Sequence, residues 1–282
     1  MILEEQKRTL DSWQTSARYW DKYRALIAQI FAPLTSGLVD EARIEVGQRV
    51  LDIGGGTGEP ALTISSIVGP TGSVMYTDPV AGMVETTQAE AAKRGLTNIH
   101  FAQCSADELP FADRTFDAAV GRLSAMFFVD PVKAVREALR VIAEDGIVSF
   151  VVWGPKEANP FFSAVTDVID RFVEVPPQDP DAPETFRFAP PGKLARVLEN
   201  AGAKNVIERR LNFQIEAPIS FERFWELRTE MSGTLRDKMA RLMPTQRPTV
   251  KQAVVDAARR YFVSGTMSFP AQGLIVSGRK SA

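Results

Sequence analysis

The feature of this sequence that most restricts its fold is a glycine-rich loop placed directly after a short apolar segment. Residues 50–58 read Val-Leu-Asp-Ile-Gly-Gly-Gly-Thr-Gly. Glycine has no Cβ, so a backbone with glycine at every second position, here Gly54, Gly56 and Gly58, can approach a ligand very closely. The pattern predicts a nucleotide-type ligand at the carboxyl end of a strand over 50–53.

Strand and helix signals alternate on both sides of this loop. Apolar strands are expected at 50–53, 74–77, 99–103, 116–120 and 147–152, with helices between them at 60–68, 80–94 and 131–142. Such alternation is typical of a doubly wound α/β fold with a mostly parallel sheet.

The two ends of the chain differ from this pattern. An amphipathic helix that Pro33 ends is predicted by the helical spacing of Trp13, Ala17, Trp20, Ile27 and Phe31, and a second short helix is expected around 38–42. Beyond residue 153, the sequence predicts a proline-rich loop (176–191), a helix (191–201), a strand (206–215), helices from Ser220 to 262 and a last strand (273–277).

These signals predict four parts. They are an N-terminal helical lid over 1–44, a ligand-binding core over 45–153, a cap over 154–270 that includes the late core strand near 206–215, and a final strand over 271–282. The helical cap is therefore expected to be inserted before the last strand.

Two common nucleotide loops fit the glycine pattern poorly. A phosphate-cradling P-loop ends in Gly-Lys-Ser/Thr, whereas this chain has Gly58-Glu59-Pro60. A dinucleotide loop starting at Gly54 would need its third glycine at Glu59, where a carboxylate would repel a pyrophosphate. Asp78, at the end of the next strand, can accept both hydrogens of a ribose diol or can cap the helix that follows.

The chain resembles the class I S-adenosylmethionine-dependent methyltransferases, in particular the branch of the ubiquinone/menaquinone C-methyltransferases. Asp52 and the three glycines match the family's D-x-G-x-G-x-G, and residues 104–111 are similar to its G-D-A-E-x-L-P-F. Segments 116–120 and 137–141 extend the likeness, which covers about 45–153. The resemblance implies a Rossmann-like, seven-stranded methyltransferase fold, S-adenosylmethionine as cofactor and S-adenosylhomocysteine as product.

The resemblance also implies where the adenine end of the cofactor binds. The family's adenine-binding Asp is Ser105 here, which leaves Asp107 or the backbone of Ala106 to recognise the base. Met83 matches a position that packs on adenine, although a core methionine explains it as well.

At the methionine end, the resemblance places the backbone of Gly121 and Arg122 beside the cofactor. It also places the N-terminal helix over the site. Tyr19 and Tyr23 are then candidates to close that end or to meet the acceptor, and Trp20 is either a cofactor contact or a core anchor of the helix.

Methyl transfer from a sulfonium is an in-line displacement that alignment and exclusion of water can accelerate without a compulsory acid or base. The only histidine, His100, is expected to be an ordinary strand residue, and Cys104 has no second thiol beside it, so neither predicts a nucleophile or a metal site. Aromatic side chains at 126–128, 159–162, Phe186 and Phe188 either wall an acceptor site or belong to the core.

Composition excludes several classes of partner. The chain has 33 Lys plus Arg and 35 Asp plus Glu residues, so it lacks the basic excess of a nucleic-acid binder. The segment after the fourth strand also lacks the Asn/Asp-Pro-Pro-aromatic signature of methyltransferases that act on DNA bases or glutamine. The apolar run 147–153 is too short to span a membrane. A start without a signal-peptide pattern and a single cysteine predict a cytoplasmic location.

Charge is nevertheless uneven along the chain. Residues 204–260 carry 12 basic and 7 acidic side chains. This excess indicates either solvated helix faces or a basic lid that receives an anionic or membrane-associated substrate.

Together these features predict a methyltransferase that acts on a hydrophobic or aromatic small molecule, with no nucleic-acid partner and no stable membrane insertion. A non-catalytic S-adenosylmethionine-binding module and a nicotinamide-dependent oxidoreductase are the alternatives. The sequence leaves open the acceptor, the atom that is methylated and the oligomeric state.

Overall fold

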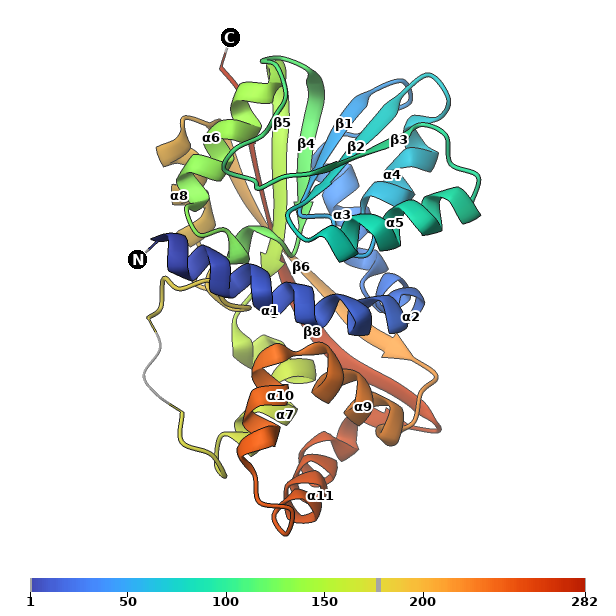
Figure 1. The fold of residues 1–282 in the computed structure, drawn as a ribbon, viewed down its shortest axis with the longest axis vertical. Coiled ribbons are helices and arrows are strands. Elements are labelled where there is room, and N and C mark those ends of the chain that lie inside the picture. Colours follow the sequence, from blue (N-terminus) through green and yellow to red (C-terminus); the bar gives the residue numbers. More distant parts are fainter. Residues whose placement is uncertain (1, 176–178, 282) are drawn as a thin grey trace.

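A computed structural model describes residues 2–175 and 179–281 of the chain (Figure 1). Its centre is one sheet in the order β3-β2-β1-β4-β5-β8-β6. The strands along this path are β1 (Arg49–Ile53), β2 (Ser73–Asp78), β3 (Ile99–Gln103), β4 (Phe116–Arg122), β5 (Ile142–Trp153), β6 (Lys204–Ala217) and β8 (Thr266–Arg279).

Strands β1 to β5 run parallel, and β8 is antiparallel to both of its neighbours, β5 and β6. The expected mostly parallel α/β sheet is therefore confirmed. The expected number of seven strands is wrong by one, because the two-residue strand β7 (Phe262–Val263) pairs with β8 outside the main path. A segment of two residues is too short to show an alternating pattern in the sequence.

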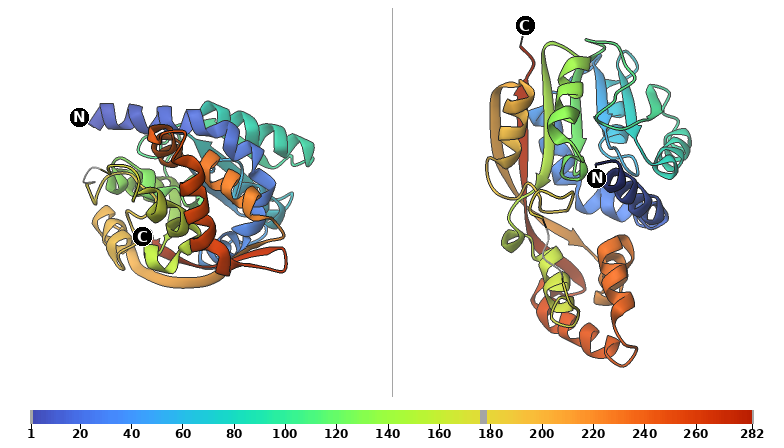
Figure 2. Two further views of the ribbon diagram at one scale, coloured as in Figure 1. Left: turned by 90° about the horizontal axis from the view of Figure 1, so that it is seen from below. Right: turned by 60° about the vertical axis from the view of Figure 1, so that its left-hand side comes forward.

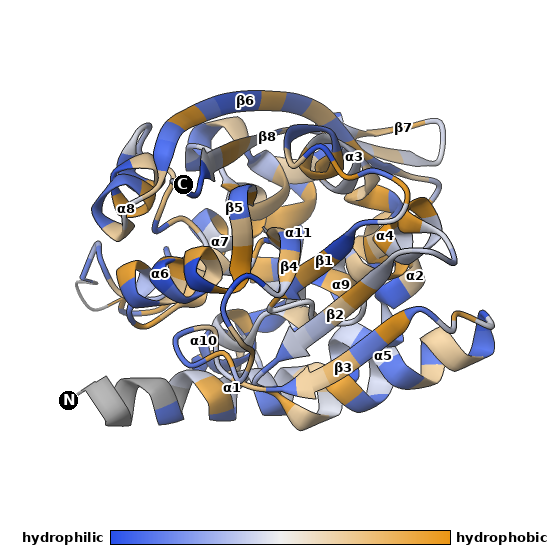
Figure 3. Cartoon of the chain, turned by 90° about the horizontal axis from the view of Figure 1, so that it is seen from above, coloured by the Kyte–Doolittle hydropathy of each residue, from blue (hydrophilic) through white to orange (hydrophobic). Residues whose placement is uncertain are grey.

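Helices cover the sheet and bury its central strands. Helix α4 (Ala61–Val68) packs on β2, α5 (Ala81–Lys93) on β3, and α6 (Pro131–Val141) with α8 (Lys193–Ala201) on β5 and β8. Val50 and Leu51 of β1 are fully buried, as expected for a parallel strand covered on both faces. The edge strand β6 alternates hydrophilic and hydrophobic residues and keeps one face exposed (Figure 3).

The N-terminal region forms three helices where two were expected. They are α1 (Ile2–Lys22), α2 (Arg24–Ile30) and α3 (Ala32–Glu41). Pro33 was expected to end a helix, but it lies in the first turn of α3. Proline is compatible with that position because the first turn has no intrahelical partner for its missing N–H.

The cap consists mainly of helices α7 (Pro160–Ile169), α9 (Phe221–Met231), α10 (Gly233–Arg241) and α11 (Arg247–Ala258), with single 3-10 turns η2 (Lys156–Ala158) and η3 (Arg259–Tyr261). Helices α9 to α11 are inserted between β6 and β8, as the fold prediction stated. The sequence analysis assigned no helix to α7, and it expected the last strand to begin several residues after its observed start at Thr266. The proline-rich segment is irregular over 179–191, and 176–178 lie outside the described residues.

Helix α1 lies between the strand ends of the core and the helices of the cap (Figures 1 and 2). It contacts α5 on the core side, and α9 and α10 on the cap side. Within the described ranges, no helix combines the length and the apolar character needed to cross a membrane.

Candidate cofactor and acceptor site

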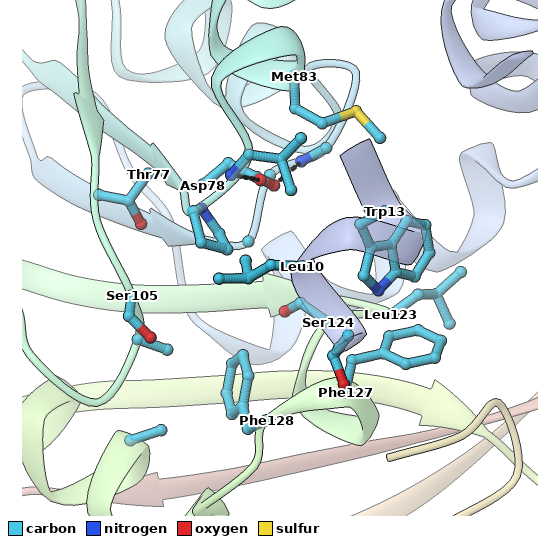
Figure 4. Close-up of a pocket in the computed structure, with 18 of the residues that line it drawn as sticks. Leu10, Trp13, Thr77, Asp78, Met83, Ser105, Leu123, Ser124, Phe127 and Phe128 are labelled. Carbon is cyan, nitrogen blue, oxygen red and sulfur yellow. Dashed lines mark hydrogen bonds between the residues drawn. The ribbon is translucent and has the colours of Figure 1, made fainter. Parts of the chain in front are cut away.

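A deep pocket opens at the carboxyl ends of β1, β2 and β4, beneath α1 (Figure 4). It encloses about 1180 Å³ of empty space, part of which is open to solvent. Its walls come from α1, the glycine loop, the end of β2, the loop after β3, and the segment from β4 through the 3-10 turn η1 (Ala125–Phe127).

The glycine loop folds back over the end of β2. The amides of Gly54 and Gly55 both donate to the carbonyl of Thr77, at 2.9 and 3.0 Å. Gly56 has φ of +54°, and a Cβ added there would meet no atom within 4 Å. The loop therefore needs glycine at position 56 for its left-handed backbone, and it leaves the space above that residue free for a ligand.

Asp78 joins this loop to the start of α5. Its Oδ2 accepts from the amide of Gly56 at 3.0 Å, and its Oδ1 accepts from the amide of Val80, the N-cap residue, at 2.9 Å. The carboxyl group thus holds the turn before the helix, whose N-cap residue is Val80 rather than Asp78, and it also lines the pocket. Burial raises the pKa of Asp78 to about 6, although the hydrogen bonds from the amides of Val80 and Gly56 act to lower it.

An acidic and a basic side chain, Asp52 and Arg122, flank the loop on its inner side. Asp52 is fully buried, and neither of its carboxyl oxygens has a hydrogen-bond partner among the described residues. Burial raises its pKa to about 8, and the positive charge of Arg122 acts against that rise. The Arg122 guanidinium lines the pocket and donates to the hydroxyl of Thr35 at 3.1 Å, while its buried Nε finds no partner in the described chain.

The adenine-side candidates Ser105 and Asp107 contact each other. The Ser105 hydroxyl lies 2.5 Å from Oδ1 of Asp107, and both residues line the pocket, as do Ala106 and the buried Met83. Burial raises the pKa of Cys104 beside them to about 11, so its thiol stays protonated near neutral pH.

Aromatic side chains form the opposite wall of the pocket. The ring of Trp13 on α1 packs edge-on against Phe127 at 4.9 Å and lies 5.7 Å from the ring of Trp20. Phe31 and Phe128 add to this wall. The indole Nε1 of Trp20 is buried without a hydrogen-bond partner among the described residues, so one donor remains available at this end.

The predicted site residues fall into three groups. Eight of them line the pocket: Trp20, Gly54, Gly56, Asp78, Met83, Ser105, Ala106 and Arg122. Three lie behind the lining: Asp52, Gly58 and Gly121. A Cβ at Gly121 would come within 2.7 Å of Phe150 and Ser124, so this glycine permits close packing behind the site.

Tyr19 and Tyr23, the catalytic candidates, lie outside the pocket lining. The Tyr19 hydroxyl accepts from Arg18, and the buried Tyr23 donates to Glu230. Both hydroxyls are engaged in contacts between helices or along α1. His100 is an exposed residue of β3, away from the pocket.

The sequence analysis missed part of the lining on α1. Thr9 and Leu10 contribute to the pocket together with Trp13. Leu10, Trp13 and Ala17 follow one helical face, so the same periodicity that predicted the helix could have extended its pocket face by one turn. Across the described ranges, no cluster of three or more His, Cys, Asp or Glu side chains is arranged to hold a metal ion.

Comparison with known proteins explains this combination of fold and loop. Residues 50–146 match the methyltransferase domain family model. The chain is 29% identical to the aklanonic acid methyltransferase DauC of Streptomyces sp. strain C5 over 212 residues, which cover 74% of this chain and 86% of that protein. Residues 50–146 of this chain therefore form a class I S-adenosylmethionine-dependent methyltransferase domain.

Two further comparisons show how much of this methyltransferase is similar to known proteins. It is 34% identical to the ubiquinone/menaquinone biosynthesis C-methyltransferase UbiE of Hahella chejuensis over 131 residues, which are 46% of this chain and only about half (52%) of the relative's length. The solved structure of YcgJ from Bacillus subtilis matches the fold with a TM-score of 0.56 and 20% identity, covering 88% of this chain and 98% of YcgJ.

S-adenosylmethionine is the cofactor of this methyltransferase family, and the pocket residues fit it. The buried carboxyl of Asp52 has no hydrogen-bond donor within the described chain, the space above Gly56 is free, and the carboxyl of Asp78 lines the pocket. Arg122 lines the same pocket and carries a positive charge suited to the carboxylate of an amino acid.

Proposed function

We propose that this methyltransferase transfers the methyl group of S-adenosylmethionine to a hydrophobic or aromatic small molecule. The observation that carries the proposal is a single pocket with carboxyl groups on one side and the rings of Trp13, Phe127 and Phe128 on the other. The names of two relatives, an aklanonic acid methyltransferase and a ubiquinone/menaquinone C-methyltransferase, support an acceptor of this size and chemistry.

Each charged group of the pocket has a role at the cofactor. Asp78 accepts hydrogen bonds from the ribose hydroxyls with the lone pairs that Gly56 and Val80 leave free. Asp52 faces the ammonium group from beneath the loop, and Arg122 binds the carboxylate of the methionine end.

The aromatic wall holds the acceptor and keeps water out. Bound S-adenosylmethionine would supply an electrophilic methyl group on a positively charged sulfur, and that sulfur would leave as the neutral thioether of S-adenosylhomocysteine. The chain contributes alignment: Trp13 and Trp20 of α1 close the pocket, Phe31 and Phe127 contact the apolar frame, and the Trp20 N–H orients an acceptor oxygen. The protonated thiol of Cys104 is unsuited to act as a nucleophile or base.

The test measures cofactor binding and turnover separately. Thermal unfolding is followed with S-adenosylhomocysteine, NADH and ATP, and a ligand at 100 times its Kd is expected to add roughly 2.7 kcal/mol. S-adenosylhomocysteine alone should raise the Tm. Formation of S-adenosylhomocysteine is then measured with phenols, quinols, aromatic acids and amines, and with peptide and RNA as comparison substrates.

Turnover with at least one of the small molecules, but with neither peptide nor RNA, supports the proposal. Methylation of peptide or RNA in place of the small molecules would reject the acceptor class. Binding of S-adenosylhomocysteine without turnover on any acceptor would favour a binding module over an enzyme.

A further inference from the structure

The turn that joins α10 to α11 presents an apolar side chain to solvent at the end of the cap farthest from the sheet (Figure 1). Met243 lies in this turn and is 59% exposed. Pro244 and Pro248 beside it are exposed as well. Residues 241–251, which contain this turn and the start of α11, are called the cap tip below.

Hydrogen bonds hold the turn in a defined shape. The Met243 amide donates to Oε1 of Gln246 at 2.9 Å, and the Gln246 amide donates back to the Met243 carbonyl at 2.9 Å. Leu242 and Val250 are buried and anchor the cap tip to the rest of the cap. The exposed methionine is therefore presented by an ordered turn.

Three basic side chains of the cap tip flank this methionine. Arg241 ends α10, Arg247 begins α11, and Lys251 follows one turn later on the same face of α11. Arg241 and Arg247 are exposed, and Lys251 is half-buried. In the part of the chain that the structure describes, none of the three is in an ion pair or a side-chain hydrogen bond.

Acidic side chains do not neutralise this charge. The sequence has no acidic residue between Asp237 and Asp256. Asp256 pairs with Arg259, and Asp170, which follows the helix α7 that packs on α11, pairs with Lys238. Asp237 is exposed and outside the described ion pairs, so the cap tip keeps more positive than negative charge.

The stability of the cap does not account for these residues. Arg247 occupies the first turn of α11, where the helix dipole disfavours a positive charge, and that turn has no acidic residue. Met243 is too exposed to contribute much to the core. A partner that is both anionic and apolar would match the charge and the methionine together.

We propose that the cap tip docks on the surface of an anionic lipid bilayer, with its three basic side chains at the headgroups and Met243 in the interfacial layer. Each basic residue near an anionic leaflet contributes about fivefold to binding, and a methionine gains by leaving water. A nucleic acid would match the charges alone.

The distribution of charge over the whole chain favours this orientation. Residues 1–203 carry 19 basic and 28 acidic side chains, whereas residues 204–260 carry 12 basic and 7 acidic ones. An anionic surface therefore attracts the cap and repels the core. The inference goes beyond the proposed function and does not depend on which molecule is methylated.

The experiment measures how the full chain sediments with vesicles at millimolar lipid. One set of vesicles contains phosphatidylcholine alone, and in the other one lipid in three is phosphatidylglycerol. The wild type should bind the anionic vesicles at least about tenfold more strongly, and salt at about 0.5 M should remove most of the difference. Binding of a labelled RNA and a labelled DNA duplex is titrated separately.

Two variants separate charge from insertion. Arg241→Gln, Arg247→Gln and Lys251→Gln combined should weaken binding to the anionic vesicles roughly hundredfold, at about fivefold for each charge. Met243→Gln, which leaves the charge unchanged, should weaken it about fivefold. If the combined variant has a lower Tm than the wild type, Arg247→Gln alone carries the test, with a loss of about fivefold expected.

The matched control removes the same charge from the core. Lys93, Lys204 and Arg210 are exposed and outside the described ion pairs. Lys93→Gln, Lys204→Gln and Arg210→Gln combined should leave binding to the anionic vesicles at the wild-type level or slightly above it.

Equal binding to the two kinds of vesicle, including no binding to either, overturns the inference. So does a preference for anionic vesicles that persists in the cap-tip variants, or one that the core control loses to the same extent. Binding to RNA or DNA without binding to anionic vesicles would assign the cap tip to nucleic acid instead of a bilayer.

Discussion

The hydroxyl of Tyr23 donates a hydrogen bond to Oε2 of Glu230 at 2.8 Å and thereby ties the junction of α1 and α2 to helix α9 of the cap. Lys22 reaches the same oxygen at 2.6 Å, and the guanidinium of Arg223 lies over the Tyr23 ring at 4.6 Å. The N-terminal helix that closes the pocket is therefore fastened to the cap at the end of α1. Tyr23 is part of this joint, which is why it lies outside the pocket.

Tyr23→Phe is expected to lower the free energy of unfolding by about 1 kcal/mol, the net value of one hydrogen bond, and to leave kcat unchanged. Denaturant unfolding and steady-state kinetics measure the two effects. Tyr19→Phe serves as the control because its hydroxyl is bonded only to the adjacent Arg18. A loss of turnover at unchanged stability would place Tyr23 in the catalytic machinery instead.

Asp78→Asn should weaken binding of S-adenosylhomocysteine by roughly 1 to 3 kcal/mol, because the amide accepts at one atom where the carboxylate accepts at two. Isothermal titration at neutral pH provides the measurement. Asp117→Asn, at the opposite end of β4 where the carboxylate bonds Arg49, is the matched control and should bind normally. Equal affinities in both variants would remove Asp78 from the site.

The affinity for S-adenosylhomocysteine should also depend on pH through Asp78. Its folded-state pKa of about 6 means that the accepting carboxylate is lost as the pH falls below that value. Wild-type binding should therefore be weaker at about pH 5 than at about pH 7.5, and Asp78→Asn should show a smaller change. A pH profile that is the same in the variant and the wild type would assign the dependence to another group.

Asp52 predicts how the stability of the ligand-free protein changes with pH. Its pKa rises from 3.8 in a model peptide to about 8 in the fold because burial penalises the charged form. The folded state therefore binds the proton more tightly than the unfolded state, so this group's stabilising effect is complete below about pH 4 and is lost as the pH rises through about 8.

The window between about pH 6 and pH 8 lies above the pKa of Asp78, so Asp52 dominates there. The free energy of unfolding of the wild type should fall across this window, and Asp52→Asn should flatten the curve. Chemical denaturation at several pH values tests this, and a variant curve parallel to the wild type would show that Asp52 does not titrate there.

Asp107→Asn should weaken recognition of the adenine amino group more than Ser105→Ala does, because Asp107 supplies the carboxylate in this part of the pocket. The direct measure is the ratio of affinities for S-adenosylhomocysteine and its inosine analogue, which has an oxygen in place of the amino group. The ratio should shrink in Asp107→Asn. If Ser105→Ala shrank it equally, the hydroxyl would share the role.

The core of the fold could be predicted because its signals are local. Gly54, Gly56 and Gly58 after an apolar strand, and Asp78 at the end of the next, follow from backbone geometry over a few residues. Six of the eight predicted site residues that line the pocket lie at or just after strand ends; Trp20 and Met83 instead come from helices α1 and α5. Strand ends of a parallel sheet meet at one edge, so residues there converge whatever the loops do.

The cap could not be predicted in the same way. Helix α7 begins with Pro160 and two phenylalanines, and its burial depends on partners such as Phe31 and Phe269, which are distant in sequence.

The position of β8 between β5 and β6 has a consequence for how the protein is made on the ribosome. Among the described strands, β6, which ends at Ala217, pairs only with β8, and β8 begins only at Thr266. While the cap helices are being translated, the edges of β5 and β6 both carry unpaired backbone groups. The sheet closes only when the chain as far as Arg279 has emerged from the ribosome. Until then the two strand edges must be shielded if the nascent protein is to avoid aggregation.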